Sequence, residues 1–320
     1  MGNVSINLSL ANIWKSWYDF KKGKNKTSEL ECFTYFLENN LYSLFNDLNN
    51  SNYKHGDYKK FVVCDNKRRE ISVASIRDRV VHRLVYNFLT EVYDKKFIFD
   101  LWSNRKNKGL VGAIKRTSYL SQKYKNSFIW RADIKKFFDN VNQAILIKIL
   151  KLKINQETDL NILKEIISSY SSSRWGAIGL PIGNLTSQIF SNIYLNEFDR
   201  FIKHTIKPLA YLRYGDDFII FSKNSQVLTN IRQKSIIFLE KKLNLKINDK
   251  NDVMIRVDKG IRFLGVIIYP YRLKLNKRNQ QRVFRQLNLN NYQSYYGLIK
   301  QFQPKTIKEF YWYLYQLLNK

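Results

Sequence analysis

The chain has 320 residues, of which 55 are Lys or Arg and 26 are Asp or Glu, so its formal net charge is +29. Because 44 % of the residues are hydrophobic, the chain can fold around a core, and its basic surface should attract a polyanion. Nucleic acid is the favoured partner, and a membrane surface is the less favoured alternative. Only two cysteines, Cys32 and Cys64, and three histidines occur, without a Cys-x-x-Cys motif, which excludes a zinc site of standard spacing.

No apolar run reaches the roughly 18 residues of a membrane span. The first residues, Met-Gly-Asn-Val-Ser-Ile, lack the cationic and apolar regions of a signal peptide. We therefore expect a cytoplasmic protein without a membrane partner. With only 12 Gly and 4 Pro we also expect no flexible linker, and so one compact catalytic unit with subdomains.

The first hundred residues predict helices around a hairpin. Apolar residues recur at helical spacing over 30–48, where Cys32 is expected in the core, and again over 76–92. Between these helices, 58–63 and 70–73 predict a hairpin whose tip is basic.

The middle of the chain alternates between strands and helices. Residues 128–134 predict a strand, and 141–152 and 162–170 predict helices. The segment 180–184, Leu-Pro-Ile-Gly-Asn, has the composition of a loop and leads into a helix that includes 189–202. Strands interleaved with helices, without a strict βαβ rhythm, predict an α+β fold.

Two adjacent carboxylates then follow in Tyr214-Gly215-Asp216-Asp217, between two apolar runs that predict a strand–turn–strand unit. Turns alone favour Asp and Gly, so a plain turn is the alternative to a functional site. A third carboxylate, Asp133, ends another predicted strand and favours the functional interpretation. Phosphoryl transfer with two metal ions about 3.5–4 Å apart needs carboxylates brought together from separate elements.

The last third predicts a helix at 227–243 and a strand at 263–268 paired with 273–275. From Lys277 onward the chain is basic and aromatic, with helical spacing.

In chain order, these pieces resemble the fingers and palm of a reverse transcriptase, over about residues 14–275. The segments that carry the resemblance are 75–82 and 103–109 of the fingers, the A motif Asp133-Ile-Lys-Lys-Phe-Phe138-Asp, the C motif Tyr214-Gly-Asp-Asp217 and the primer grip Phe263-Leu264-Gly265. The resemblance implies a right-hand polymerase fold, whose palm is an antiparallel sheet backed by helices. The implied domains are N-terminal helices and fingers at 1–127, a palm at 128–275 that includes part of the fingers, and a short helical thumb at 276–320.

The B motif, from Gly179 to Leu195, is similar to that of reverse transcriptases from diversity-generating retroelements, with Ser187-Gln188 and the later Asn-x-Tyr typical of that type. One departure is Gly215, where that group more often has a bulkier residue. Antiphage and abortive-infection reverse transcriptases share much of the pattern, and retron and group II intron enzymes are more distant relatives.

The resemblance implies that Asp133, Asp216 and Asp217 are the catalytic residues. Asp133 and Asp216 would bind two Mg²⁺ ions, with Asp217 assisting and the carbonyl oxygen of Ile134 completing the shell. Mn²⁺ can substitute for Mg²⁺ in such sites.

The resemblance also implies contacts with the incoming nucleotide. Phe138 would exclude a 2′-hydroxyl, with a core ring as the alternative, and Arg69 with Lys67 would grip the triphosphate, with a solvated tip as the alternative. Gly183 and Gln188 of the B motif belong to the same expected site.

Ile182 stands where many reverse transcriptases have a Gln that contacts the nucleotide sugar. An aliphatic side chain offers no hydrogen bond there, so the resemblance implies error-prone copying. The alternative is that Ile182 only packs under the loop.

Three functions remain open from the sequence. The first is an RNA-directed DNA polymerase of a diversity-generating retroelement, which makes cDNA from dNTPs on an RNA template and works with a small basic accessory protein. The second is an antiphage reverse transcriptase that uses a noncoding RNA template or extends without one. The third, from another class, is an RNA-binding protein with a decayed polymerase site.

Overall fold

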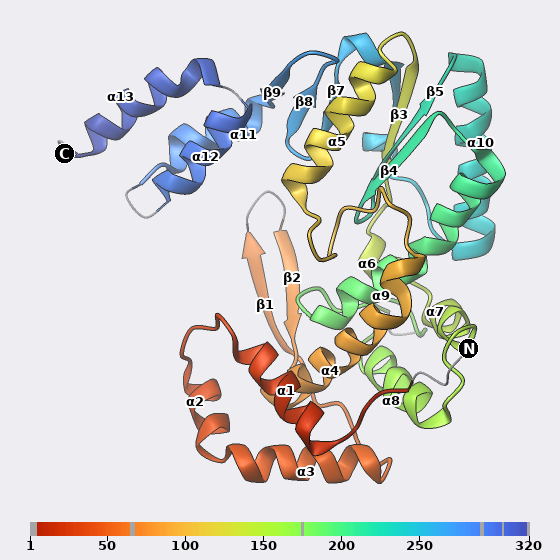
Figure 1. Cartoon of the computed structure of the whole chain (residues 1–320), viewed down its shortest axis with the longest axis vertical. Helices are drawn as coiled ribbons and strands as arrows, with labels where there is room; N and C mark the ends of the chain where they lie inside the picture. The colour runs from red at the N-terminus through yellow and green to blue at the C-terminus, as the bar shows by residue number, and fades with distance from the viewer. Residues whose placement is uncertain (1–4, 65–67, 174–175, 289–290, 303, 319–320) are drawn as a thin grey trace. The chain divides into compact units, whose positions relative to one another are not determined.

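The computed structural model describes residues 5–64, 68–173, 176–288, 291–302 and 304–318 (Figure 1). The chain divides into two compact units, each made of segments that are distant in sequence. The first unit consists of Met1–Phe99, Ile134–Phe201 and Ser235–Ile247. The second consists of Asp100–Asp133, Ile202–Lys234 and Asn248–Lys320.

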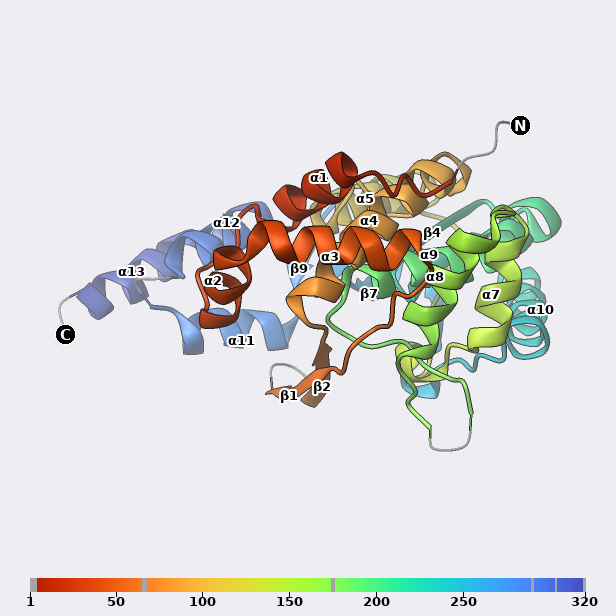
Figure 2. The same cartoon turned by 90° about the horizontal axis from the view of Figure 1, so that it is seen from below.

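The first unit is mainly helical and carries one hairpin. Its helices are α1 (Leu10–Lys21), α2 (Ser28–Tyr35), α3 (Leu37–Asn49), α4 (Ile76–Tyr93), α6 (Phe137–Asn140), α7 (Gln143–Lys151), α8 (Glu157–Ser168), α9 (Leu185–Arg200) and the second half of α10 (Ser225–Leu243). The helix α4 lies at its centre and contacts both α1 and α9 (Figures 1 and 2). Ser75 begins α4 as an N-cap, since its side chain accepts a hydrogen bond from the Asp78 amide.

The hairpin of the first unit pairs β1 (Lys59–Cys64) with β2 (Arg68–Val73) in antiparallel register. The residues of β1 are exposed on both faces, and the predicted hairpin is confirmed; residues 65–67 of its predicted basic tip lie outside the described residues. The single helical stripe predicted over 30–48 is wrong in one respect, because Phe36 separates α2 from α3. Cys32 on α2 is exposed, which corrects the expectation of a core position.

The second unit is built on a four-stranded antiparallel sheet with the order β4-β5-β3-β6. These strands are β3 (Phe128–Asp133), β4 (Ala210–Tyr214), β5 (Asp217–Ser222) and β6 (Val253–Arg256). The side chains of β5 are buried after Asp217, and its apolar run Phe-Ile-Ile-Phe lies inside the sheet, between β4 and β3. The helix α5 (Leu110–Lys123) contacts β4 of this sheet.

A smaller sheet and three helices complete the second unit. They are β7 (Ile261–Phe263), β8 (Val266–Ile268), β9 (Leu273–Leu275), α11 (Lys277–Gln286), α12 (Tyr292–Phe302) and α13 (Ile307–Leu318). The strand predicted over 263–268 is wrong, because Leu264 and Gly265 take positive φ angles of 50° and 86° and turn the chain between β7 and β8. The predicted pairing with 273–275 is confirmed.

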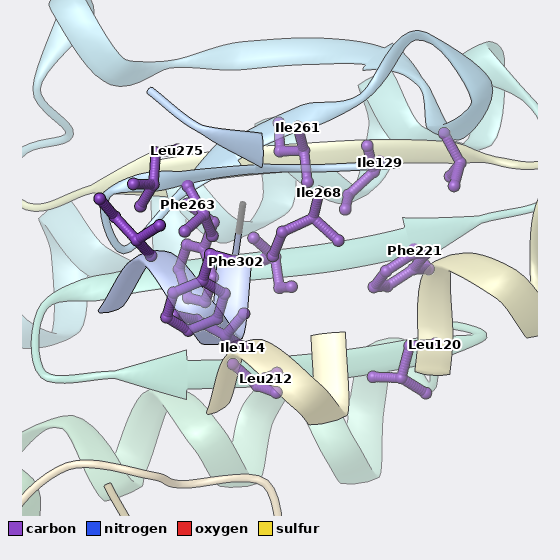
Figure 3. Close-up of a cluster of buried hydrophobic side chains, with 14 of the residues drawn as sticks. Ile114, Leu120, Ile129, Leu212, Phe221, Ile261, Phe263, Ile268, Leu275 and Phe302 are labelled. Carbon is purple, nitrogen blue, oxygen red and sulfur yellow. The ribbon is translucent and has the colours of Figure 1, made fainter. Parts of the chain in front are cut away.

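One hydrophobic cluster joins all parts of the second unit. Ile114 on α5, Leu212 and Phe221 on the sheet, Phe263 on β7 and Phe302 on α12 are all buried in it (Figure 3). The α+β class with an antiparallel sheet backed by helices is therefore confirmed. Of the helices in the part of the chain that the structure describes, none is both long and apolar enough to cross a bilayer.

Candidate active site

The register of the main sheet places two of the three predicted aspartates opposite each other. Asp133 ends β3 and Asp217 begins β5, and the two residues are antiparallel partners. Asp216 lies in the two-residue turn between β4 and β5, next to Gly215 with its φ of 65°. One end of the sheet therefore carries three carboxylates from two elements, as the sequence predicted.

Asp217 is engaged by an arginine that sequence reasoning missed. Arg131 Nε donates to Asp217 Oδ1 at 3.0 Å, and Arg131 Nη2 donates to Oδ2 at 2.8 Å. Burial raises the pKa of the Asp217 carboxyl to about 6, Arg131 opposes this rise, and the charges of Asp216 and Asp133 add to it. Asp216 and Asp133 are thus close enough to Asp217 for their charges to act on its carboxyl group.

Asp133 is held on one oxygen and has the other oxygen without a partner. Its Oδ2 accepts hydrogen bonds from Asn251 Nδ2 at 2.8 Å and from Asn248 Nδ2 at 3.4 Å. Its Oδ1 is buried and has no hydrogen-bond partner in the described structure. A buried carboxylate oxygen without a donor is costly unless a cation satisfies it, so this atom fits a metal ligand.

The carboxylates are nevertheless not arranged as a ready metal cage. Within the described residues, no three His, Cys, Asp or Glu side chains are gathered as a group that could hold an ion. Both oxygens of Asp217 accept hydrogen bonds from Arg131. The oxygen donors at the sheet end are nonetheless the type that Mg²⁺ prefers.

Two polar side chains form hydrogen bonds with the turn that carries Asp216. The amide of Gly215 donates to Ser103 Oγ at 2.8 Å, and its carbonyl oxygen accepts from Arg213 Nη1 at 2.9 Å. Arg213 is fully buried, and its backbone pairs with Asp100 and Trp102. The backbone beside Asp216 is therefore fixed by hydrogen bonds to both the amide and the carbonyl group of Gly215.

In the first unit, the B-motif loop pairs with β2 of the hairpin. The amide of Ser72 donates to the carbonyl oxygen of Ile182 at 2.9 Å. Asn184 completes the attachment, since its Nδ2 donates to Ser72 O at 2.7 Å and its Oδ1 accepts from the Ala74 amide at 3.2 Å. The loop thus follows β2 much as a neighbouring strand would.

This attachment brings two predicted nucleotide contacts to one pocket. Arg69 of β2 and Ile182 of the loop both line a pocket of about 590 Å³. Its remaining lining residues are Lys60, Arg68, Glu70, Lys136, Asp139, Asn140, Tyr170, Ser171, Ser172, Ser173 and Ile178. The pocket is therefore mainly polar with a basic edge, and its two isoleucines are the apolar part of its wall.

The other predicted contacts of the first unit lie elsewhere or are not described. Phe138 is half-buried on α6 against Phe137, with ring centroids 5.3 Å apart, and is not among the residues lining the pocket. Gln188 is exposed on α9. Lys67 lies outside the described residues.

Two further predictions concern backbone groups. Ile134 directly follows Asp133 and makes an isolated antiparallel bridge with Ile247. Phe263 ends β7, Leu264 and Gly265 form the turn to β8, and Gly265 O accepts from Asn279 Nδ2 of α11 at 3.0 Å. The expected primer grip is therefore a turn tied to the first of the three C-terminal helices.

The fold and this set of carboxylates define a polymerase of the right-hand class, and comparison with known families agrees. The profile described as reverse transcriptase (RNA-dependent DNA polymerase) matches residues 54–268, which include the three aspartates and the pocket, and the chain belongs to this family.

Particular relatives are distant. The chain is 24 % identical over 239 residues to the protein YkfC of Escherichia coli, with 62 % of each chain covered. It is 20 % identical to the group II intron-encoded protein LtrA of Lactococcus lactis, covering 79 % of this chain and 53 % of that protein. It is 30 % identical over 112 residues to the retron Ec83 reverse transcriptase of Escherichia coli, covering 33 % and 36 %. The chain spans less than two thirds of the length of these relatives.

Solved structures show the same fold. Apo telomerase of Candida tropicalis superimposes with a TM-score of 0.52 at 16 % identity, over 68 % of this chain and 55 % of the other. Candida albicans telomerase, in complex with a fragment of telomeric RNA, gives 0.53 at 13 % identity, over 85 % and 58 %.

Proposed function

We propose that the protein is an RNA-directed DNA polymerase, which adds nucleotides from dNTPs to a primer 3′-hydroxyl on an RNA template and produces cDNA. The observation that carries the proposal is the pairing of Asp133 with Asp217 at the sheet end, beside the turn that holds Asp216. Membership of the reverse transcriptase family supports it.

In this proposal, Asp133 and Asp216 would hold two Mg²⁺ ions, which Mn²⁺ could replace, with Asp217 assisting and the Ile134 carbonyl as a further ligand. The ions would supply acidification of the primer hydroxyl and neutralisation of the leaving pyrophosphate. The partnerless Oδ1 of Asp133 supports a cation there. Asn251 steadies the same carboxylate through its other oxygen.

The pocket of the first unit supplies the proposed nucleotide contacts. Arg69 and its basic neighbours would attract the triphosphate, because guanidinium groups bind phosphate oxygens through two parallel hydrogen bonds. Ile182 would face the nucleotide with a side chain that contributes shape and no polar atom. Gly183 and Gln188, next to it in sequence, would support the same loop.

The finer proposal is a reverse transcriptase of the diversity-generating type, which copies a structured or repeat RNA with low fidelity and works with a small basic accessory protein. The B motif with its Ser187-Gln188 pair supports this type. The position of Ile182 in the pocket wall supports low fidelity, because a site that lacks a hydrogen bond to the correct nucleotide discriminates less.

Primer extension tests the chemistry. The purified protein, a DNA primer on a heteropolymeric RNA template and four dNTPs should yield full-length cDNA with Mg²⁺ or Mn²⁺ and none with excess chelator. The same reaction on a DNA template shows how strongly the template sugar matters. No product on RNA under either metal, with RNA binding intact, would contradict the proposal and favour an RNA-binding protein with a decayed site.

Fidelity tests the finer proposal through Ile182→Gln. An added amide can hydrogen-bond a correctly seated nucleotide, and one net hydrogen bond of about 0.5–1.5 kcal/mol corresponds to roughly two- to tenfold better discrimination. Sequencing of cDNA made on one RNA template gives the error rates of wild type and variant.

The matched control is Ile237→Gln, the same substitution at an exposed isoleucine of α10 that does not line the pocket, which should leave the error rate unchanged. Accurate copying by the wild type, with the same error spectrum in all three proteins, would reject the diversity-generating type and leave the antiphage type in its place.

A further inference from the structure

Arg131 is in direct contact with Asp217, one of the three carboxylates at the end of the sheet. It lies on β3 two residues before Asp133, so the two side chains share a face of the strand. Arg131 is the partner of Ile219, which makes Asp217 its diagonal neighbour on β5. A long side chain reaches such a diagonal position.

The geometry of the Arg131 contact is that of a specific ion pair. Two parallel hydrogen bonds of 3.0 and 2.8 Å join the guanidinium to both oxygens of Asp217. The side chains are 18 % and 16 % exposed, so water screens the pair only weakly. Such a two-pronged contact fixes the orientation of the carboxylate as well as its charge.

The contact changes what the three carboxylates can offer to a cation. With Arg131 in place, the negative charge of Asp217 is balanced by a guanidinium group. Asp133 keeps a buried oxygen without a partner, whereas both oxygens of Asp217 are occupied. Asp133 therefore has an oxygen available for a cation, whereas Asp217 is already engaged by Arg131.

We propose that Arg131 is a positioning residue that holds Asp217 in reserve and so weakens the binding of divalent cations to the aspartate cluster when no nucleotide is present. This inference rests on the proposed function, whose catalytic carboxylates it concerns. A cation that binds must compete with the guanidinium for Asp217, and it meets the positive charge of Arg131, whose side chain lies on the same face of β3 as Asp133.

The test is Mn²⁺ binding to the full chain without nucleotide or nucleic acid, at one fixed pH for all variants. The signal of free Mn²⁺ in electron paramagnetic resonance measures how much of the ion is bound. Arg131→Met should lower the Kd for Mn²⁺ about tenfold, since it removes a cation and frees an anionic ligand. Arg131→Lys keeps the positive charge but cannot make the two parallel hydrogen bonds to Asp217, so the Kd for Mn²⁺ should fall only about two- to threefold.

A second variant shows whether Arg131 acts through Asp217. The double variant Arg131→Met with Asp217→Asn replaces a neutral ion pair by a neutral pair, so it should return the Kd to within about twofold of wild type. Removing both partners of the ion pair together also avoids leaving either of their charges unpaired, which protects folding.

The matched structural control is Arg116→Met. Arg116 of α5 forms the same kind of ion pair, with two hydrogen bonds of 2.9 and 3.1 Å to Asp100. Its loss should leave the Kd for Mn²⁺ unchanged.

An unchanged Kd in Arg131→Met would overturn the inference. A tightened Kd that persists in the double variant would also overturn it, because Arg131 would then not act through Asp217. Primer extension by the wild type is measured alongside, so that a failure of this inference is distinguished from a failure of the polymerase proposal. Absence of Mn²⁺ binding in every protein would contradict both.

Discussion

Phe138 and Phe137 are adjacent aromatic residues with different surroundings. Phe137 is fully buried, whereas Phe138 is half-buried, and the carbonyl oxygen of Phe138 accepts from the Leu180 amide at 2.8 Å. The hydrogen bond ties the backbone of Phe138 to the start of the B-motif loop. A ring that the core does not fully enclose is available to touch a nucleotide sugar.

Phe138→Ala should therefore admit ribonucleotides. Removing the ring opens space where a 2′-hydroxyl would lie, and the ratio of kcat/KM for dNTP over rNTP should fall by about tenfold or more. The control is Phe137→Ala, which should lower the free energy of unfolding by about 3–5 kcal/mol through a core cavity and leave that ratio unchanged. An unchanged ratio in Phe138→Ala would make Phe138 a packing residue.

The sequence could predict the carboxylates but not their partners. Asp133 and Asp217 follow from strand ends and turn composition, which are local signals. Arg131 and Asn251 reach them through register and through a segment more than a hundred residues away. The sequence did contain a signal for Arg131, because a basic residue two places before an aspartate on a strand must share a face with it. The sequence contained no such signal for Asn251.

At the scale of elements, the junction between β2 and the B-motif loop depends on Gly183. Its φ is 117°, and a Cβ there would lie 2.7 Å from Ile71 Cγ2 and 3.3 Å from Ser72 O. A side chain at this position would therefore strain the backbone and push the loop away from β2.

Gly183→Ala should lower the free energy of unfolding by about 1–3 kcal/mol and raise KM for dNTP, because the loop carries Ile182 into the pocket. Gly23→Ala is the control, since Gly23 has a φ of 71° but no atom within 4 Å of its added Cβ, and should cost only about 1 kcal/mol. Denaturant unfolding measures both. Equal losses would show that the close approach to β2 is unimportant.

Helices and strands could be predicted where the hydrophobic pattern continues over many residues. Their boundaries were predicted wrongly where a short turn interrupts the pattern. The helix over 76–92 and the strand over 128–134 correspond to α4 and β3. The break at Phe36 and the turn at Leu264-Gly265 interrupt continuous apolar patterns, so periodicity alone could not reveal them. In both places the backbone conformation ends the helix or strand, although apolar residues continue through the break.

For the whole molecule, the net charge of +29 has the clearest consequence. Self-repulsion of this size opposes compaction unless a polyanion neutralises part of it. The affinity for single-stranded RNA should therefore fall with salt, with a log–log slope of about −0.7 per phosphate contact. Charge of this kind is spread over many residues, so removing one catalytic carboxylate should not change RNA binding.

The central claim is that the aspartates at the sheet end perform nucleotide addition, and Asp216→Asn tests it most directly. Extension of a primer on RNA should fall by about a thousandfold or more, while the Kd for RNA stays within about twofold of wild type. Asp258→Asn removes the same charge from an exposed site in the same unit, and should leave both values unchanged. Primer extension by Asp216→Asn at the wild-type rate would contradict the account.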